Sequence, residues 1–312
     1  MKLVTYENPV TSKPRLGWLI NERIYDVEAA AAAFDHQLPS SMLEFLEMEE
    51  DGRKAAKEVY YRVCEQTPSS FLSFDENAVK LLAPIPHPRS FRDFYAFEQH
   101  VKTARSKRGL DMIPEWYEIP VFYFSNHQAI CGPDSVIFKP TKTERLDFEL
   151  EVACVIGRKG THIAVDQAES YIAGFTILND WSARDLQQQE MKVGLGPAKG
   201  KDFATSVGPW LVTPDELADK KAGNGYDLTM VARINGQEVS RGNLKDLYWS
   251  FSQMIARASE DVTLYPGDLI GSGTVGTGCI LELGSENVPW LQPGDIVELE
   301  VERLGVLRNI IQ

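Results

Sequence analysis

Residues 146–156 have the sequence Leu-Asp-Phe-Glu-Leu-Glu-Val-Ala-Cys-Val-Ile, and this stretch decides the fold. Acidic and apolar residues alternate up to residue 151, and the run is apolar from there on. Because side chains of a β-strand alternate with period two, we predict a strand with Asp147, Glu149 and Glu151 on one side. Neighbouring carboxylates on one face lie about 6.5–7 Å apart and repel each other. The stretch therefore predicts either a hard cation such as Mg²⁺, Ca²⁺ or Mn²⁺ between the acids, or a solvated acidic edge strand.

The chain that surrounds this strand is rich in short β-branched runs. Pro-Gly-Asp turns at 266–268 and 293–295 separate several of them. Such spacing favours a β-rich barrel or sandwich over a doubly wound α/β sheet. We expect a few helices to interrupt it, at residues 166–171, 179–190 and 244–258.

The first 83 residues are predicted to form a small separate α/β unit. Strands are expected at 3–6, 16–20 and 23–27, with Asn21 and Glu22 as the turn between the last two. Helices are expected at 28–34, 41–49 and 51–64. Three prolines between residues 84 and 88 exclude a helix or a central strand there. We therefore predict an α+β, β-rich protein with domains at 1–83 and 84–312.

Composition limits the partners of the chain. Its 312 residues are 43% hydrophobic, as in ordinary globular proteins, and its net charge is 32 − 45 = −13. This charge argues against nucleic acid or an anionic membrane as partner, because the field repels both. No signal peptide or membrane-spanning apolar run is visible. The four cysteines are widely scattered, so we expect reduced core residues in a cytoplasmic protein.

Two other segments add candidate side chains. Asp180 follows the apolar run 172–178, where a carboxylate can cap a helix or bind a ligand. Asp93 and His100 lie seven residues apart. Taken alone, Asp180 is most simply a helix cap, Asp93 a solvated acid and His100 a structural histidine.

Six motifs together resemble the fumarylacetoacetate hydrolase family, over about residues 84–312. They are D-F-Y-A-F-E-Q-H at 93–100, L-D-F-E-L-E at 146–151, N-D-W-S-A-R-D-L-Q at 179–187, G-L-G-P-A-K-G-K at 194–201, S-G-T-V-G at 272–276 and G-C-I-L-E-L at 278–283. N-D-W-S-A-R-D is specific by itself, and the order of all six agrees with the family. The resemblance implies a mixed β-roll or barrel for the C-terminal domain.

The resemblance also implies a set of site residues. The metal, Mg²⁺ or else Ca²⁺ or Mn²⁺, is expected on Asp93, Glu149, Glu151 and Asp180. The catalytic residues are expected to be His100, with Glu282 to orient it, Lys201 and Gln187. The substrate-binding residues are expected to be Tyr123, Arg108 (with Arg105 as second candidate) and Thr274. Without the resemblance, Lys201 is a solvated lysine and Glu282 the outward residue of a strand.

The activity that the resemblance implies is metal-dependent cleavage of a carbon–carbon bond in an anionic 1,3-diketo acid. Fumarylacetoacetate, cleaved to fumarate and acetoacetate in aromatic amino-acid catabolism, is the expected substrate. The alternatives within the family are acylpyruvate hydrolase, oxaloacetate decarboxylase and isomerase activities. An alternative of another class is a catalytically silent metal- or partner-binding protein. A homodimer is expected by analogy with the family, and residues 102–111 fit either a mobile lid or a solvated helix end.

Overall fold

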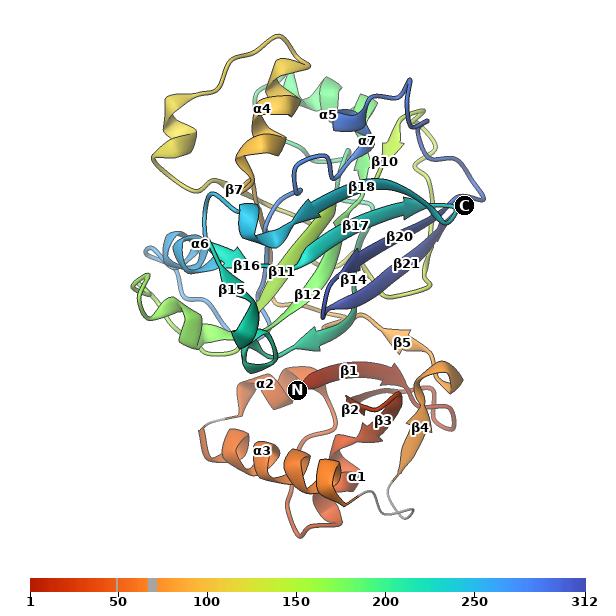
Figure 1. Cartoon of the computed structure of the whole chain (residues 1–312), viewed down its shortest axis with the longest axis vertical. Helices are drawn as coiled ribbons and strands as arrows, with labels where there is room; N and C mark the ends of the chain where they lie inside the picture. The colour runs from red at the N-terminus through yellow and green to blue at the C-terminus, as the bar shows by residue number, and fades with distance from the viewer. Residues whose placement is uncertain (49, 67–71) are drawn as a thin grey trace.

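The computed structural model describes residues 1–48, 50–66 and 72–312. Two large sheets dominate it (Figure 1). The larger has twelve strands, ten of them in the order β4-β3-β2-β1-β14-β12-β11-β19-β6-β7, while β5 pairs with β1 and β8 with β14. Its strands are β1 (Lys2–Glu7), β2 (Pro14–Ile20), β3 (Arg23–Asp26), β4 (Ser73–Asp75), β5 (Leu81–Leu82), β6 (Phe91–Phe94), β7 (Phe122–Phe124), β8 (Ile130–Cys131), β11 (Leu150–Ile156), β12 (Ile172–Asp180), β14 (Thr205–Val212) and β19 (Leu269–Gly271).

The second sheet has five strands in the order β18-β17-β20-β21-β9. They are β9 (Val136–Ile137), β17 (Thr229–Ile234), β18 (Gln237–Asn243), β20 (Ile296–Val301) and β21 (Gly305–Ile311). Two short pairs complete the strands, namely β10 (Leu146–Asp147) with β13 (Ser182–Ala183), and β15 (Lys221–Ala222) with β16 (Gly225–Tyr226). The expected α+β, sheet-rich class is confirmed, but both large sheets are open among the described residues, so the barrel part of the expectation is not met.

Helices cover the ends and faces of these sheets. The α-helices are α1 (Val27–Ala32), α2 (Met42–Glu47), α3 (Glu50–Glu65), α4 (Glu98–Ser106), α5 (Arg184–Met191), α6 (Phe251–Ala258) and α7 (Ile280–Leu283). The 3₁₀ helices are η1 (Glu76–Ala78), η2 (Pro114–Tyr117), η3 (Ala168–Tyr171), η4 (Pro214–Lys220) and η5 (Leu244–Asp246). Helices α4, α5 and α7 lie together at the end of the molecule farthest from the N-terminus (Figure 1).

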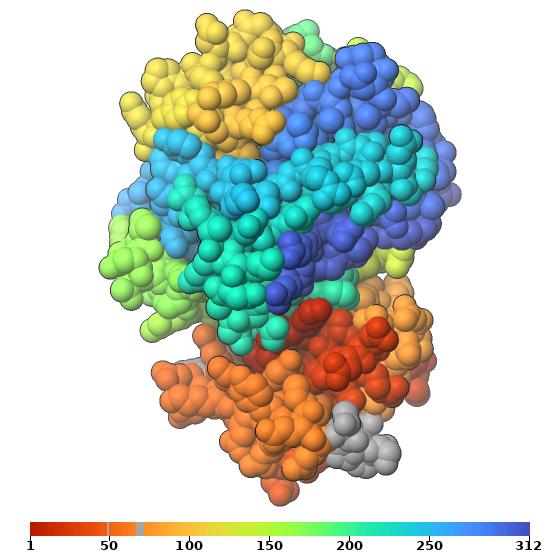
Figure 2. All heavy atoms as spheres, viewed as in Figure 1, coloured from red at the N-terminus to blue at the C-terminus, as the bar shows by residue number. Residues whose placement is uncertain are grey.

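The N-terminal unit follows the sequence-based expectation closely. Asn21 and Glu22 form the turn between β2 and β3, and both have the positive φ angles, 48° and 62°, of a two-residue hairpin loop. Ser41 caps α2 by accepting a hydrogen bond from the Glu44 amide. The expected end of this helix, Glu49, lies outside the described residues. The first 83 residues form the lower lobe in Figure 2.

The sheet runs across the expected domain boundary. Strand β1 pairs with β14, with Lys2 opposite Val212 and Leu3 opposite Leu211, so backbone hydrogen bonds join the two lobes. The division after residue 83 stays a prediction.

Strand β11 is buried on both faces. Val152 and Cys154 pack into the C-terminal core, whereas Ala153 and Val155 join a second cluster that includes Trp18 and other N-terminal residues. A strand covered on both faces has a continuous apolar run. This packing explains why the alternation of residues 147–151 gives way to apolar residues.

Three expected helices differ from the structure in their extent. Helix α5 starts at Arg184 instead of residue 179, because residues 179–180 end β12 and residues 182–183 form β13. The segment 166–171 holds only the 3₁₀ helix η3, and the segment 244–258 is divided into η5 and α6. Ser250 starts α6 with a capping box, in which Gln253 also bonds back to its backbone.

All four cysteines are free thiols, as expected. Cys154 and Cys279 are buried and Cys131 is partly buried, but Cys64 is exposed on α3, so the expected core location is wrong for Cys64. Among the described residues, no helix is both long and apolar enough to cross a membrane.

Candidate active site

The strand order gathers acids from distant parts of the chain at one sheet end. Asp180 is the last residue of β12, and Leu150 of neighbouring β11 is paired with Asn179, beside Asp180. On the other side of β11, β19 pairs with β6 so that Gly271 lies opposite Asp93. Asp93 in turn lies opposite Tyr123 of β7. The four predicted metal ligands therefore converge, although 87 residues separate Asp93 from Asp180.

The four acids are buried around one lysine. Asp93, Glu149, Glu151 and Asp180 are each at most 5% exposed, and so is Lys201. The Lys201 ammonium donates to Asp180 Oδ2 at 2.6 Å and to Glu149 Oε2. The expectation of a solvated lysine is thereby excluded, and Lys201 lies inside what we call the carboxylate cluster.

The cluster carries strongly shifted acidities. Burial raises the pKa of Asp93 and of Glu151 well above the usual carboxyl range, and nearby acids add to the effect. Burial also raises the pKa of Asp180, against the opposing effect of Lys201. Glu149 differs, because Lys201 and Arg184 outweigh its burial and lower its pKa. Most of the cluster therefore resists ionisation until further positive charge compensates it.

Glycines make room for this close packing. A side chain at Gly271 would collide with Asp93 Oδ1 and approach Glu151. Gly273, with φ at +76°, donates its amide to Glu151 Oε2 at 3.1 Å. Thr274 Oγ1 donates to Glu151 Oε1 at 3.3 Å. Thr274, expected to bind substrate, thus contacts one of the acids in this structure.

The cluster fits a hard divalent cation. Asp93 Oδ1 and Asp180 Oδ1 are buried and have no hydrogen-bond partner among the described residues. Buried carboxylate oxygens without a donor are costly. Carboxylate oxygens are the donors that Mg²⁺, Ca²⁺ and Mn²⁺ prefer. The solvated edge strand is excluded as an explanation of Glu149 and Glu151, since both are buried.

A second group, which we call the dyad, pairs His100 with Glu282. His100 Nδ1 lies 2.7 Å from Glu282 Oε2, and the residues are 4% and 7% exposed. His100 lies on α4 and Glu282 on α7, which contact each other. The alternative that Glu282 is the outward residue of a strand is wrong, because Ile280–Leu283 is helical and Glu282 is buried.

Arg184 links the dyad to the carboxylate cluster. Its guanidinium donates to Asp147 Oδ2 and to Glu149 Oε1, at 2.8 Å each. Asp147 in turn accepts the Ile280 and Leu281 amides at 2.7 and 3.0 Å, and so caps α7. Sequence reasoning missed both roles, although the motif at 179–187 contains Arg184.

The N-cap alternative for Asp180 is also excluded. Asp180 ends β12, and its carboxylate accepts from Lys201 and, at 2.5 Å, from the hydroxyl of Tyr123. The residue at the N-cap of α5 is Ala183, which makes no side-chain cap. Tyr123, expected to bind substrate, therefore lies against an acid of the cluster.

The remaining predicted residues lie around the two groups. Gln187 Oε1 accepts from Arg184 at 3.1 Å. Arg108 donates from Nε to the Ala104 carbonyl at 3.0 Å, and its charge lowers the pKa of Tyr95, although burial raises that pKa overall to about 12. Arg105 donates instead to the Asp111 carbonyl. Both arginines thus bond to backbone carbonyls, and the choice of Arg108 as the substrate-binding arginine stays a prediction.

Tyr95 was not anticipated as a site residue. Its ring packs edge-on against the His100 imidazole, with centroids 5.3 Å apart and planes at 84°. Burial raises the pKa of Tyr95, and the charges of Arg108, Glu149 and Arg184 also act on it. The only signal in the sequence was its position inside the D-F-Y-A-F-E-Q-H motif.

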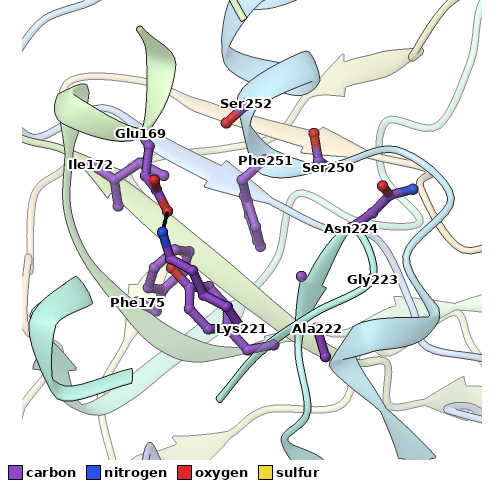
Figure 3. Close-up of a pocket in the computed structure, with 12 residues that line it drawn as sticks. Glu169, Ile172, Phe175, Lys221, Ala222, Gly223, Asn224, Ser250, Phe251 and Ser252 are labelled. Atoms are coloured by element: carbon purple, nitrogen blue, oxygen red, sulfur yellow. Dashed lines mark ion pairs between the residues drawn. The ribbon is translucent and has the colours of Figure 1, made fainter. Parts of the chain in front are cut away.

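A separate surface cavity of about 420 Å³ lies between η3, the β15–β16 hairpin and the start of α6. Figure 3 shows its Glu169–Lys221 ion pair over an apolar floor that includes Phe175 and Phe251. None of the predicted site residues lines it.

Comparisons with known proteins identify the family and the fold. The family model described as fumarylacetoacetate (FAA) hydrolase C-terminal matches residues 89–312. The chain is 31% identical to the mitochondrial oxaloacetate tautomerase Fahd2a of Rattus norvegicus, over 99% of this chain and 91% of the relative. It is 35% identical to the 2,4-didehydro-3-deoxy-L-rhamnonate hydrolase of a Sphingomonas species, over 61% of this chain and 64% of the relative. The solved structure of fumarylacetoacetate hydrolase from Exiguobacterium antarcticum superposes with a TM-score of 0.73 at 24% identity, covering 100% and 99% of the two chains, and so shares the fold.

Proposed function

We propose, from the premise that this chain belongs to the fumarylacetoacetate hydrolase family, that it is a divalent-metal-dependent enzyme acting on a small anionic 2-oxo acid. The observation that carries the proposal is the buried carboxylate cluster beside the buried His100–Glu282 dyad. Cation-binding oxygens and an oriented base in one site are what proton transfer next to a carbonyl requires. This arrangement also argues against a catalytically silent binding protein.

Asp93, Glu149, Glu151 and Asp180 would hold the cation, which when bound polarises a keto oxygen and offsets the negative charge of the substrate. The chain itself, at a net charge of −13, would otherwise repel an anion. Lys201 keeps Glu149 and Asp180 in place through its two hydrogen bonds. The native metal is proposed to be Mg²⁺, with Ca²⁺ or Mn²⁺ as alternatives.

His100 is the proposed base. Its Nδ1 donates to Glu282 Oε2, which fixes the tautomer in which Nε2 carries no proton and can accept one. Tyr95 packs against the ring edge and limits its rotation. The carboxylate of Glu282 also stabilises the imidazolium that forms when Nε2 takes a proton.

The favoured reaction is interconversion of the enol and keto forms of oxaloacetate. The relative that spans 99% of this chain bears this activity in its name. The reaction needs one proton removed from the enol oxygen and one delivered to the neighbouring carbon, with no bond to water. His100 Nε2 can serve both steps, since a single imidazole can release at carbon the proton it accepts from oxygen. Decarboxylation of the same substrate is a related possibility for this site.

A second candidate is hydrolysis of a carbon–carbon bond in a 1,3-diketo acid such as fumarylacetoacetate. The contact between His100 and Glu282 favours it, because the pair resembles a serine-hydrolase triad with water in place of serine. His100 would take a proton from water, the oxygen would add to the carbonyl, and the carbon–carbon bond would break as the departing carbon is protonated. Lys201, Gln187 and Arg108 are the proposed donors to the oxyanion.

One set of assays separates the candidates. Purified protein receives enol-oxaloacetate, fumarylacetoacetate and acetylpyruvate in parallel, with Mg²⁺ or Mn²⁺ and again with EDTA. We expect metal-dependent loss of the enol absorbance of oxaloacetate, with keto-oxaloacetate as product. Faster metal-dependent cleavage of a diketo acid would make hydrolysis the main activity. No turnover of any of them would contradict the proposal.

A Glu282→Gln variant sharpens the choice between the two reactions. Hydrolysis depends on a strongly basic imidazole, so we expect this variant to lose more cleavage than tautomerisation. Equal losses of both activities would indicate that Glu282 only positions the ring.

We also propose a homodimer, by analogy with the family. Light scattering on the purified protein tests this oligomeric state. The rat relative is named as mitochondrial, so fractionation of cells that express the protein tests the cytoplasmic location expected from the sequence.

A further inference from the structure

A third side chain joins the dyad. Cys279 Sγ lies 3.6 Å from Glu282 Oε2, the same oxygen that pairs with His100 Nδ1 at 2.7 Å. One sulfur, one nitrogen and one oxygen donor thus lie within 4.8 Å of one another, and all three residues are buried. The proposed proton transfer uses His100 and Glu282 and leaves the thiol without a role.

The chemistry of these three donors differs from that of the carboxylate cluster. Carboxylate oxygens suit Mg²⁺ and Ca²⁺, whereas thiolate with imidazole selects softer cations such as Zn²⁺. In a tetrahedral zinc site with bonds of about 2.0–2.3 Å, neighbouring donors lie roughly 3.3–3.6 Å apart. The Sγ–Oε2 distance of 3.6 Å already agrees with this spacing. The Nδ1–Oε2 pair at 2.7 Å would open by less than about 1 Å.

A second observation indicates that a cation can bind beside Glu282. Glu282 Oε1 is buried and has no hydrogen-bond partner among the described residues. An unpaired carboxylate oxygen in a dry environment is costly, and a bound cation would compensate it. The short helix α7 fixes Cys279 and Glu282 relative to each other, since Cys279 is its N-cap residue and Asp147 holds its first amides.

We propose that Cys279, His100 and Glu282 form a second metal site, which binds Zn²⁺ and thereby switches off the base. On binding, the Cys279 thiol loses its proton to solvent and the thiolate ligates the ion. The imidazole keeps one proton, which moves from Nδ1 to Nε2 as Nδ1 becomes a ligand. Nε2 then cannot accept a proton from substrate or water. The inhibition rests on the proposed function, whereas the metal binding does not.

Binding of Co²⁺ tests this site by its absorption spectrum, without any measurement of enzyme activity. The full-length protein is first saturated with Mg²⁺, so that the carboxylate cluster does not compete, and is then titrated with Co²⁺. We expect the near-ultraviolet charge-transfer band of a cobalt thiolate, at one equivalent, and its loss when Zn²⁺ is added. Cys279→Ser should abolish the band. Cys131→Ser, the matched control, should keep it, because the Cys131 thiol lies outside the proposed site and donates to the Ala129 carbonyl.

Each outcome of these experiments either supports the second metal site or overturns it. Absence of the band in the wild-type protein would overturn the site. The site would also be overturned if the band survived in Cys279→Ser and in a Cys279→Ala variant that circular dichroism shows to be folded. With Mg²⁺ in excess, Zn²⁺ should inhibit the wild-type enzyme at a concentration at least about 10-fold lower than it does Cys279→Ser, each compared with its own activity without zinc. A cobalt band without inhibition by Zn²⁺ would refute the proposal that metal binding at this site switches off the base. A protein that turns over none of the substrates would still show the band, so failure of the two proposals can be distinguished.

Discussion

The carboxylate cluster and the dyad are both buried acidic groups in one site, yet they are built in opposite ways. The cluster brings four acids to the ends of neighbouring strands around one lysine, and among the described residues Asp93 Oδ1 and Asp180 Oδ1 have no donor. The dyad brings one acid and one histidine from two helices into a hydrogen bond of 2.7 Å. In the proposed function the first group therefore requires an added cation, whereas the second orients its base without one.

The two groups are nevertheless mechanically connected. Arg184 donates to Glu149 of the cluster and to Asp147, which caps the helix that carries Glu282. A disturbance on one side can therefore reach the other through this guanidinium.

The largest expected effect is on turnover, and it distinguishes the role of the dyad from that of the carboxylate cluster. Substituting His100→Ala should lower turnover by about 10³- to 10⁴-fold, because the base is lost. Mg²⁺ affinity, measured by calorimetry, should stay near that of the wild type, since His100 is not among the proposed ligands of Mg²⁺. His87→Ala, at an exposed histidine, serves as the control. A fully active His100→Ala variant would remove the dyad from the mechanism.

The next effect tests the connection between the groups. Arg184→Met leaves Asp147 buried without its cation and Glu149 with Lys201 alone, and breaking a buried pair in this way costs about 3–5 kcal/mol. Urea unfolding measures the loss. Arg89→Met, which breaks the exposed pair with Glu47, should change stability little. Similar stability of both variants would mean that the two groups are independent.

A pH experiment tests the dependence of the cluster on metal. The pKa values of Asp93 and Glu151 are raised in the folded state. A carboxyl with a raised pKa stabilises the fold below its unfolded pKa of about 4, and this stability is lost as pH rises through the folded value. In EDTA the melting temperature should therefore be lower at pH 8 than at pH 5.

Added Mg²⁺ should restore stability at pH 8, by about 2.7 kcal/mol at a hundredfold excess over Kd. Glu151→Gln should flatten the pH dependence in EDTA, because one of the two acids no longer ionises. Identical melting curves at both pH values, with and without Mg²⁺, would contradict the contrast drawn between the cluster and the dyad.

The smallest effect concerns one contact beside the cluster. Thr274→Val removes the hydroxyl that donates to Glu151 Oε1, and loss of such support for a metal ligand weakens metal binding about 10-fold. Turnover at saturating Mg²⁺ should change little. Thr263→Val is the control, because the Thr263 hydroxyl bonds to that of Thr161, away from the cluster. A raised KM for substrate with unchanged metal affinity would instead support the substrate-binding role expected for Thr274.

Several features could be predicted from sequence because their causes are local. The alternation of residues 147–151 determined that Glu149 and Glu151 share a side, and Asn21-Glu22 determined a hairpin turn. The motif at 93–100 identified Asp93 and His100, but the role of Tyr95 inside it went unnoticed. The start of helix α5 was predicted too early in the sequence, since an acid that can cap a helix can also end a strand.

By itself, then, the sequence determined the strand, its acidic face, the family and the candidate ligands, because periodicity and motif order are properties of neighbouring residues. Only the tertiary structure decided that Asp147 leaves the cluster to cap α7, that Arg184 joins the two groups, and that Cys279 meets His100. His100 and Cys279 lie 179 residues apart in the chain. Contacts over such separations depend on strand order and helix packing, which no local pattern encodes.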